Sequence, residues 1–362
     1  MNAMKKLSDI LLNVYLLPVN LAMKFGGDVW EKRFITRIMK FLKFKDIYAQ
    51  VRYYPQKASQ INEYQGINND FSNCAIIIQG PVIEEDDFTL ETIKLYRAYY
   101  PYARIIVSTW ENCGEDFQKT IAELKVKLVK NKYPAINGVG NINYQLVSTL
   151  NGIKVAEKMN VSYIWKTRSD QRYYHPFALD FLRIKLKNSQ KKIICLGGVR
   201  NSFTNRYFSL SDFMIFGSVE NAKVYYSCPL DDEDSSNSKH TRKNQDQRKE
   251  YYKSFLESVM KAEINGHMSI DDEMDDASIY FRNPEIMLSY NYYCKIHDHR
   301  ATEDYSYKEK YNDLLSNYID IVDAEAIGFF WKKYELQYMC ETYFDRMGKL
   351  DNIRYVVENE TR

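Results

Sequence analysis

Apolar, β-branched runs alternate with stretches of helical periodicity through the middle of the chain. Four runs have the character of strands buried on both faces: 74–81, 103–111, 126–131 and 161–170. Three stretches between them place apolar residues at helical spacing: 86–100, 115–125 and 142–159. The first of these begins at Asp86 or Asp87, which we expect to act as its N-cap. This alternation predicts a doubly wound α/β fold, a mostly parallel sheet with helices on both faces.

Three of the predicted strands end in polar or backbone-exposing residues. In doubly wound sheets, ligands bind at the carboxyl ends of the strands, where the strand order reverses. We therefore expect these strand ends to meet at one crevice. They are Gln79-Gly80-Pro81, the segment from Ser108 to Glu111, and the segment from Lys166 to Arg172.

The densest charge in the chain follows the fourth predicted strand. Lys166, Arg168, Asp170 and Arg172 occupy every second position. Because strand side chains alternate between faces, Lys166, Arg168 and Asp170 should point the same way. Two cations suit a diphosphate, since a guanidinium donates two parallel hydrogen bonds to phosphate. The carboxylate would hold a divalent cation or a hydroxyl. The alternative is an ion-pair ladder that only stabilises the fold.

A polar face is predicted on the helix that begins near residue 141. Asn141, Gln145, Ser148 and Gly152 recur at helical spacing, opposite an apolar stripe. Such a face could enter the crevice and hydrogen-bond a nucleotide, whereas a solvated face would carry more Lys and Glu. The glycine motifs of the dinucleotide fold and the P-loop are absent from the sequence.

The net charge of +2 argues against a nucleic-acid partner, which would call for a strong basic excess. Residues 1–53 nevertheless carry ten basic against four acidic residues, a net +6, so the others carry −4. The interrupted apolar run 7–25 and the basic stretch 32–45 predict an amphipathic segment lying on an anionic membrane surface. The alternative is a pair of helices packed on the main domain. The six scattered Cys lack a C-x-x-C pair, which favours a reduced, cytoplasmic chain without a standard zinc site.

Three parts are expected along the chain. Residues 1–60 form the basic, helical N-terminal segment, 70–300 the catalytic domain, and 301–362 a C-terminal helical cap with spaced aromatic residues. Within the second part, 229–250 is almost free of apolar residues. We interpret that stretch as a surface excursion, either a lid or an inert insertion.

Five motifs occur in a fixed order within residues 72–290: IIIQGPV, ARIIVSTWE, NINYQLVSTLNGIKVA, KTRSDQR and SDFMIFG. With these motifs the chain resembles the WavE-type lipopolysaccharide synthesis family. These are bacterial proteins of surface-polysaccharide clusters, regarded as glycosyltransferases of the GT-A type. The resemblance implies a GT-A-like doubly wound sheet, with the N-terminal and C-terminal helical segments added to it.

The resemblance also implies roles for single residues. A nucleotide-sugar donor would bind at Gln79, Gly80 and Pro81, and Glu111 would contact the base. The fourth strand of a GT-A fold ends in Asp-x-Asp, which holds Mg²⁺ or Mn²⁺, but this sequence has Arg168-Ser169-Asp170 there. Two alternatives follow. Either Asp170 holds Mg²⁺ or Mn²⁺ alone, or Arg168 neutralises the leaving diphosphate in place of the cation.

Glycosyl transfer with inversion needs a base for the acceptor hydroxyl, for which an Asp or Glu is the usual choice. Asp212, at the start of the apolar run SDFMIFG, is our first candidate. The acidic run 270–276 and Glu285 are the alternatives. His297 and His299 could approach a metal, but we interpret HDHR as a surface loop.

These observations predict a cytoplasmic glycosyltransferase, peripheral at the inner face of the bacterial inner membrane. It would move a sugar from a nucleotide-sugar donor to a glycan or lipid-linked glycan acceptor of lipopolysaccharide or capsule. Arg168 and Asp212 would be catalytic, and Gln79, Gly80, Pro81, Glu111, Asn141, Gln145, Lys166, Arg168 and Arg172 would bind the donor. The alternatives are a phosphoryl- or nucleotidyl-type transferase of capsule assembly and a non-catalytic membrane scaffold.

Overall fold

The computed structural model of the chain describes residues 54–61, 70–197, 208, 210–231, 284–297 and 307–334. The chain divides into two compact units, Met1–Tyr54 and Pro55–Arg362. All but the last residue of the first unit lies outside the described residues, and so does the predicted membrane-binding segment. The acidic run 270–276 and most of the excursion 229–250 also lie outside them.

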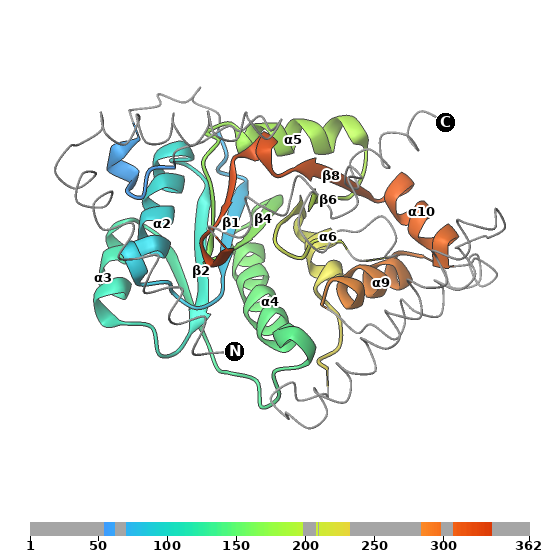
Figure 1. The fold of residues 1–362 in the computed structure, drawn as a ribbon, viewed down its shortest axis with the longest axis horizontal. Coiled ribbons are helices and arrows are strands. Elements are labelled where there is room, and N and C mark those ends of the chain that lie inside the picture. Colours follow the sequence, from blue (N-terminus) through green and yellow to red (C-terminus); the bar gives the residue numbers. More distant parts are fainter. Residues whose placement is uncertain are drawn as a thin grey trace, which may run out of the picture. The chain divides into compact units, whose positions relative to one another are not determined.

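A seven-stranded sheet runs through the second unit in the order β3-β2-β1-β4-β7-β6-β8 (Figure 1). Its strands are β1 (Cys74–Gln79), β2 (Arg104–Trp110), β3 (Lys127–Asn131), β4 (Tyr163–Arg168), β6 (Ile193–Gly197), β7 (Ile215–Ser218) and β8 (Ile319–Asp323). β1 pairs in parallel with β2 and β4, and β2 pairs in parallel with β3. β7 is antiparallel to both of its neighbours, while β8 runs parallel to β6. The sheet is therefore mostly parallel, as predicted.

Helices cover both faces of this sheet. Ile76 and Trp165 face one core, which is closed by α2 (Phe88–Tyr99), α3 (Glu115–Glu123) and α5 (Ala178–Ser189). Ile77 and Ile164 face the other core, which is closed by α4 (Ile142–Lys158), α6 (Val219–Tyr225), α9 (Pro284–Ile296) and α10 (Tyr307–Asn317). Short 3₁₀ turns complete the described chain: η1 (Ala58–Gln60), η2 (Glu85–Asp87), η3 (Val139–Asn141), η5 (Glu325–Ile327) and η6 (Lys332–Tyr334). The predicted doubly wound α/β fold is confirmed.

The boundaries of β1 to β4 and of α2 to α4 lie within two residues of the predicted ones. The uninterrupted apolar run of β1 is buried along its whole length, as a central parallel strand requires. The expected capping chemistry is wrong, however. Asp87 occupies the N-cap position of α2 with a left-handed backbone (φ 52°), and its side chain makes no capping hydrogen bond.

The prediction of a helical cap over 301–362 is incomplete. This part of the chain forms α10, but it also supplies β8 to the central sheet. It further supplies β9 (Phe329–Trp331), which pairs with β5 (Gln171–Tyr173) in a separate two-stranded sheet. Phe329 and Trp331 are two positions apart, which is the spacing of side chains on one face of a strand. The wider spacing of the other aromatic residues in this part of the chain favoured a helical interpretation.

Candidate functional site

The strand order reverses at β1, which has β2 on one side and β4 on the other. The carboxyl ends of these three strands are hydrogen-bonded together just beyond the ladder. Gly80 N donates to Ser108 O (3.1 Å), and Ser169 N donates to Gln79 O (2.9 Å). A Cβ on Gly80, whose φ is 122°, would lie 2.7 Å from Ser169 Oγ, so this close approach requires glycine. The three strand ends predicted to meet do lie side by side.

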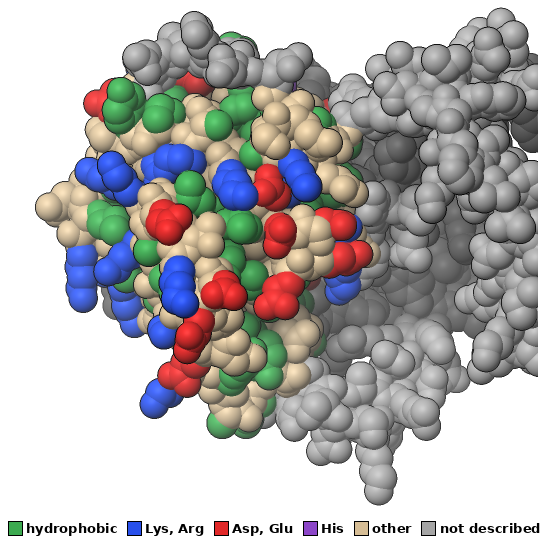
Figure 2. Space-filling view, turned by 90° about the vertical axis from the view of Figure 1, so that its left-hand side faces the viewer, with side chains coloured by type: hydrophobic (Ala, Val, Ile, Leu, Met, Phe, Trp, Pro, Cys, Tyr) green, Lys and Arg blue, Asp and Glu red, His purple; other side chains and the backbone are tan. Residues whose placement is uncertain are grey.

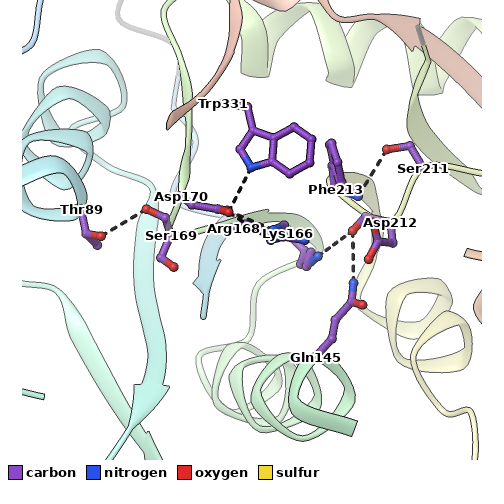
Figure 3. Close-up of polar contacts among 10 residues, drawn as sticks. All are labelled: Thr89, Gln145, Lys166, Arg168, Ser169, Asp170, Ser211, Asp212, Phe213 and Trp331. Atoms are coloured by element: carbon purple, nitrogen blue, oxygen red, sulfur yellow. Dashed lines mark hydrogen bonds and ion pairs between the residues drawn. The ribbon is translucent and has the colours of Figure 1, made fainter. Parts of the chain in front are cut away.

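Arg168 and Asp170 form a two-pronged ion pair at the end of β4 (Figure 3). Arg168 Nε lies 3.0 Å from Asp170 Oδ1, and Nη2 lies 3.0 Å from Oδ2. The indole Nε1 of Trp331 donates a third bond to Oδ2, also at 3.0 Å. The guanidinium carbon lies 5.4 Å from the ring centre of Phe213 and 5.8 Å from that of Trp331. Two aromatic rings and a carboxylate therefore fix the orientation of this arginine.

Both members of the pair stay ionised. Burial alone would raise the pKa of Asp170, but the charge and hydrogen bonds of Arg168 leave it below its ordinary value. The Arg168 side chain keeps 28% of its surface exposed. Of its five N–H groups, three make no hydrogen bond to any residue that the structure describes. Arg168 can therefore bind an anion without leaving Asp170.

Lys166 points in the same direction as Arg168 but lies deeper in the molecule. It is fully buried, and its Nζ donates to the backbone carbonyl of Asp212 at 2.7 Å. Gln145 Nε2, from α4, donates to the same oxygen at 3.2 Å. The ring centre of Tyr226 lies 5.6 Å from Lys166 Nζ. Lys166 and Gln145 thus hold the backbone of Asp212, a role that the sequence did not predict for either.

Burial lowers the pKa of Lys166 to about 7, and the charge of Asp212 opposes this shift. In an unfolded chain a lysine titrates near 10.4. Between these values the unfolded state binds more protons, so raising the pH from 7 to 9.5 should stabilise the folded state by about 3 kcal/mol through this group. Urea unfolding at pH 7 and 9.5 should show that the wild type gains about 3 kcal/mol relative to Lys166→Met, whose own change with pH reports all the other titrating groups. Equal gains in both proteins would refute the lowered pKa of Lys166.

Asp212 lies three residues before β7, and only 5% of the residue is exposed. Within the described part of the chain, no hydrogen bond reaches its carboxylate, whose charge acts on Lys166 and Arg168. Glu285, buried on α9, also acts on Arg168 through its charge. The structure therefore places two of the three predicted candidates for the base near the same guanidinium.

Arg172 does not join this group. It is buried on β5, and its guanidinium carbon lies 4.3 Å from the ring centre of Phe88. It makes five hydrogen bonds, to the backbone oxygens of Pro55, Gln56 and Phe88 and to the hydroxyls of Thr92 and Tyr174. These bonds tie α2 and the segment that precedes η1 to β5. We correct its predicted role in donor binding to a structural one.

The other residues predicted to bind the donor lie at the carboxyl ends of β1 and β2 and at the start of α4. Glu111 and Pro81 are exposed, and Gln79 is buried. Asn141 is exposed at the start of α4, where its side chain accepts from Asn137. Ser148 and Gly152, which were predicted to continue this polar helix face, pack on the sheet instead, because Ser108 donates to the backbone of Ser148 and Gly152 lies against Ile77. That part of the prediction is wrong.

The residues around Asp170 do not fit a resident metal ion. Both carboxylate oxygens already accept hydrogen bonds. Nowhere in the described ranges do three or more His, Cys, Asp or Glu residues gather as metal ligands. His297 lies 2.7 Å from Asp313 of α10, and His299 is outside the described residues.

Trp331 and Phe213 are the residues of this site that the sequence did not mark. Trp331 is 161 positions from the carboxylate that it contacts. The sequence showed it only as one of several spaced aromatic residues. Phe213 follows Asp212 directly and looked like an ordinary core residue.

Fold and site together define a doubly wound α/β protein with an ordered arginine at the strand switch point, where proteins of this architecture bind ligands. The model of the WavE lipopolysaccharide synthesis family matches residues 74–270, more than half of the 362 residues. The chain belongs to this family, and the resemblance inferred from its motifs is confirmed.

The chain matches no curated protein. Two solved structures are similar to part of it. One is a cytidylyltransferase from Leptospira borgpetersenii serovar Hardjo-bovis (strain JB197), at 14% identity and a TM-score of 0.28, over 44% of this chain and 66% of that one. The other is a CMP:2-keto-3-deoxy-manno-octonic acid synthetase complexed with CTP, at 9% identity and a TM-score of 0.29, over 44% of this chain and 78% of that one.

Proposed function

We propose that the protein is a glycosyltransferase of lipopolysaccharide or capsule synthesis that uses a nucleotide-sugar donor. The observation that carries this proposal is Arg168, which stands at the switch point with three N–H groups unused by the described residues. A guanidinium ordered in this way suits the diphosphate of a nucleotide-sugar. Membership of a lipopolysaccharide synthesis family supports a sugar as the group that is transferred.

In this proposal Arg168 stabilises the negative charge that develops on the leaving diphosphate. Its orientation is already fixed by Asp170 and the two aromatic rings, so little reorganisation is needed as the charge appears. Asp212 takes the proton of the acceptor hydroxyl as the new glycosidic bond forms. No step requires a metal ion, because Arg168 supplies the positive charge.

The direct test is a thermal-shift screen with UDP-, GDP- and CMP-sugars, followed by product analysis. A bound donor raises the melting temperature through linkage. A free nucleoside diphosphate or monophosphate, together with a glycosylated acceptor, is the expected product. A nucleotidyl-linked product would instead establish the alternative transferase of capsule assembly. Absence of any nucleotide binding would favour the non-catalytic scaffold.

The distribution of charge on the chain is relevant to partners other than the nucleotide-sugar donor. On the described part of the face in Figure 2, Lys and Arg lie mainly in the upper and left parts, and Asp and Glu lie mainly in the centre and lower right. Among the residues described, no helix is long and apolar enough to cross a bilayer. We propose attachment to the inner membrane surface through the basic N-terminal segment, whose net charge of +6 suits anionic lipid.

Deleting residues 1–45 should release the protein from vesicles that contain anionic lipid. Each basic residue near such a surface contributes about 1 kcal/mol, so loss of several should abolish reversible binding. Vesicle flotation measures this, with nucleotide affinity as the control that should not change. Equal flotation of the truncated and full-length proteins would disprove the attachment.

A further inference from the structure

The two residues Trp331 and Lys332 join the end of β4 to the loop after β1. Trp331 stands opposite Gln171 in the β5–β9 pair. The next residue, Lys332, donates its backbone N–H to Asp170 O at 3.0 Å. Its Nζ lies 2.6 Å from Asp86 Oδ2, in the turn that precedes α2. The end of β9 is thus anchored on both sides of the switch point.

This anchoring fixes the position of the Trp331 side chain. Its ring meets Phe213 edge to face, with the centroids 4.2 Å apart and an interplanar angle of 67°. Its N–H reaches Asp170 while its ring lies beside the Arg168 guanidinium (Figure 3). A phenyl ring could supply the packing and the cation–π contact. Only an indole supplies an N–H as well.

We propose that Trp331 is a positioning residue for Arg168, acting through Asp170. The proposal rests on the proposed function, in which Arg168 binds the donor diphosphate. The Trp331 N–H holds one carboxylate oxygen, and the carboxylate in turn holds Nε and Nη2 of the guanidinium. The remaining N–H groups then point away from Asp170. Ordering this side chain before the ligand arrives removes an entropic cost from binding.

Simple packing is the competing account, and Phe330 offers a matched control. It is the neighbour of Trp331 on β9, and its ring lies 6.1 Å from that of Phe88 and 6.0 Å from that of Tyr174. Trimming Phe330 weakens the packing of the same strand without touching Arg168 or Asp170. A loss of stability alone should therefore appear in Phe330→Leu as readily as in a Trp331 variant.

The experiment is calorimetric titration of the full chain with inorganic pyrophosphate, at a temperature where every variant is folded. Trp331→Phe should bind about tenfold more weakly, because binding must then order a guanidinium that the wild type already holds in place. Phe330→Leu should melt at a lower temperature but bind as the wild type does. Wild-type affinity in Trp331→Phe would overturn the proposal.

A double-mutant cycle separates positioning from a direct or purely structural effect. If Trp331 acts through the fork of Arg168, Trp331→Phe should change the affinity little once Arg168→Lys is present. The same tenfold loss in both backgrounds would refute the route through Arg168. Should Arg168→Lys alone bind pyrophosphate as tightly as the wild type, the proposed function itself fails. That result is distinct from a failure of Trp331 alone.

Discussion

Replacing Arg168 by lysine should lower the turnover of sugar transfer by about 100-fold or more. An ammonium carries the same charge as a guanidinium. It cannot donate two parallel hydrogen bonds to a phosphate and at the same time stay paired with the carboxylate of Asp170. The cost is comparable to the loss of one preorganised donor to a developing oxyanion. Steady-state kinetics with the donor identified by the screen would measure the effect. Affinity for pyrophosphate should fall in parallel.

Arg172→Lys is the matched control for this substitution. Its five hydrogen bonds hold the fold, so the variant should be less stable and yet retain donor affinity once folded. If Arg168→Lys is also merely less stable, and is fully active when folded, the pair with Asp170 is structural and the site lies elsewhere.

Four of the seven strands of the sheet, β1 to β4, could be predicted because their signals are local. The apolar run of β1 and the heptad-like spacing of α4 each reflect burial against immediate neighbours, and both were placed to within two residues. β9 was missed, since three residues pairing with β5 leave almost no periodicity to detect. The N-cap of α2 failed because backbone conformation, and not residue type alone, decides whether Asp87 can cap.

The site was predicted in part for a similar reason. Because side chains alternate along a strand, Lys166 and Arg168 were correctly predicted to share one face of β4. The alternation does not show how deeply each side chain is buried. Lys166 is fully buried and lies near Tyr226, directly after α6, whereas the Arg168 side chain keeps 28% of its surface exposed. The sequence placed Asp170 beside Arg168 but could not show that Trp331 would occupy its second oxygen. Contacts across 161 residues depend on the tertiary fold and leave no trace in local spacing.

Asp212→Asn should reduce turnover by about 10²- to 10⁴-fold and leave donor affinity within about twofold, because general-base catalysis contributes on this scale. The amide keeps the shape of the side chain. The bonds from Lys166 and Gln145 reach the backbone oxygen, so the substitution leaves them in place. Only the carboxylate, which no described residue hydrogen-bonds, is lost. The variant should therefore bind the donor and fail at the transfer step.

Glu285→Gln separates the two candidates for the base. Both carboxylates act on Arg168 through their charge, so a purely electrostatic role predicts similar, modest losses in the two variants. A base predicts a large loss in one variant alone, together with a pH–rate profile whose acid limb disappears in that variant. A large loss in Glu285→Gln with an active Asp212→Asn would move the role to α9. Two active variants would remove both residues from the proton transfer and leave the chemistry to Arg168.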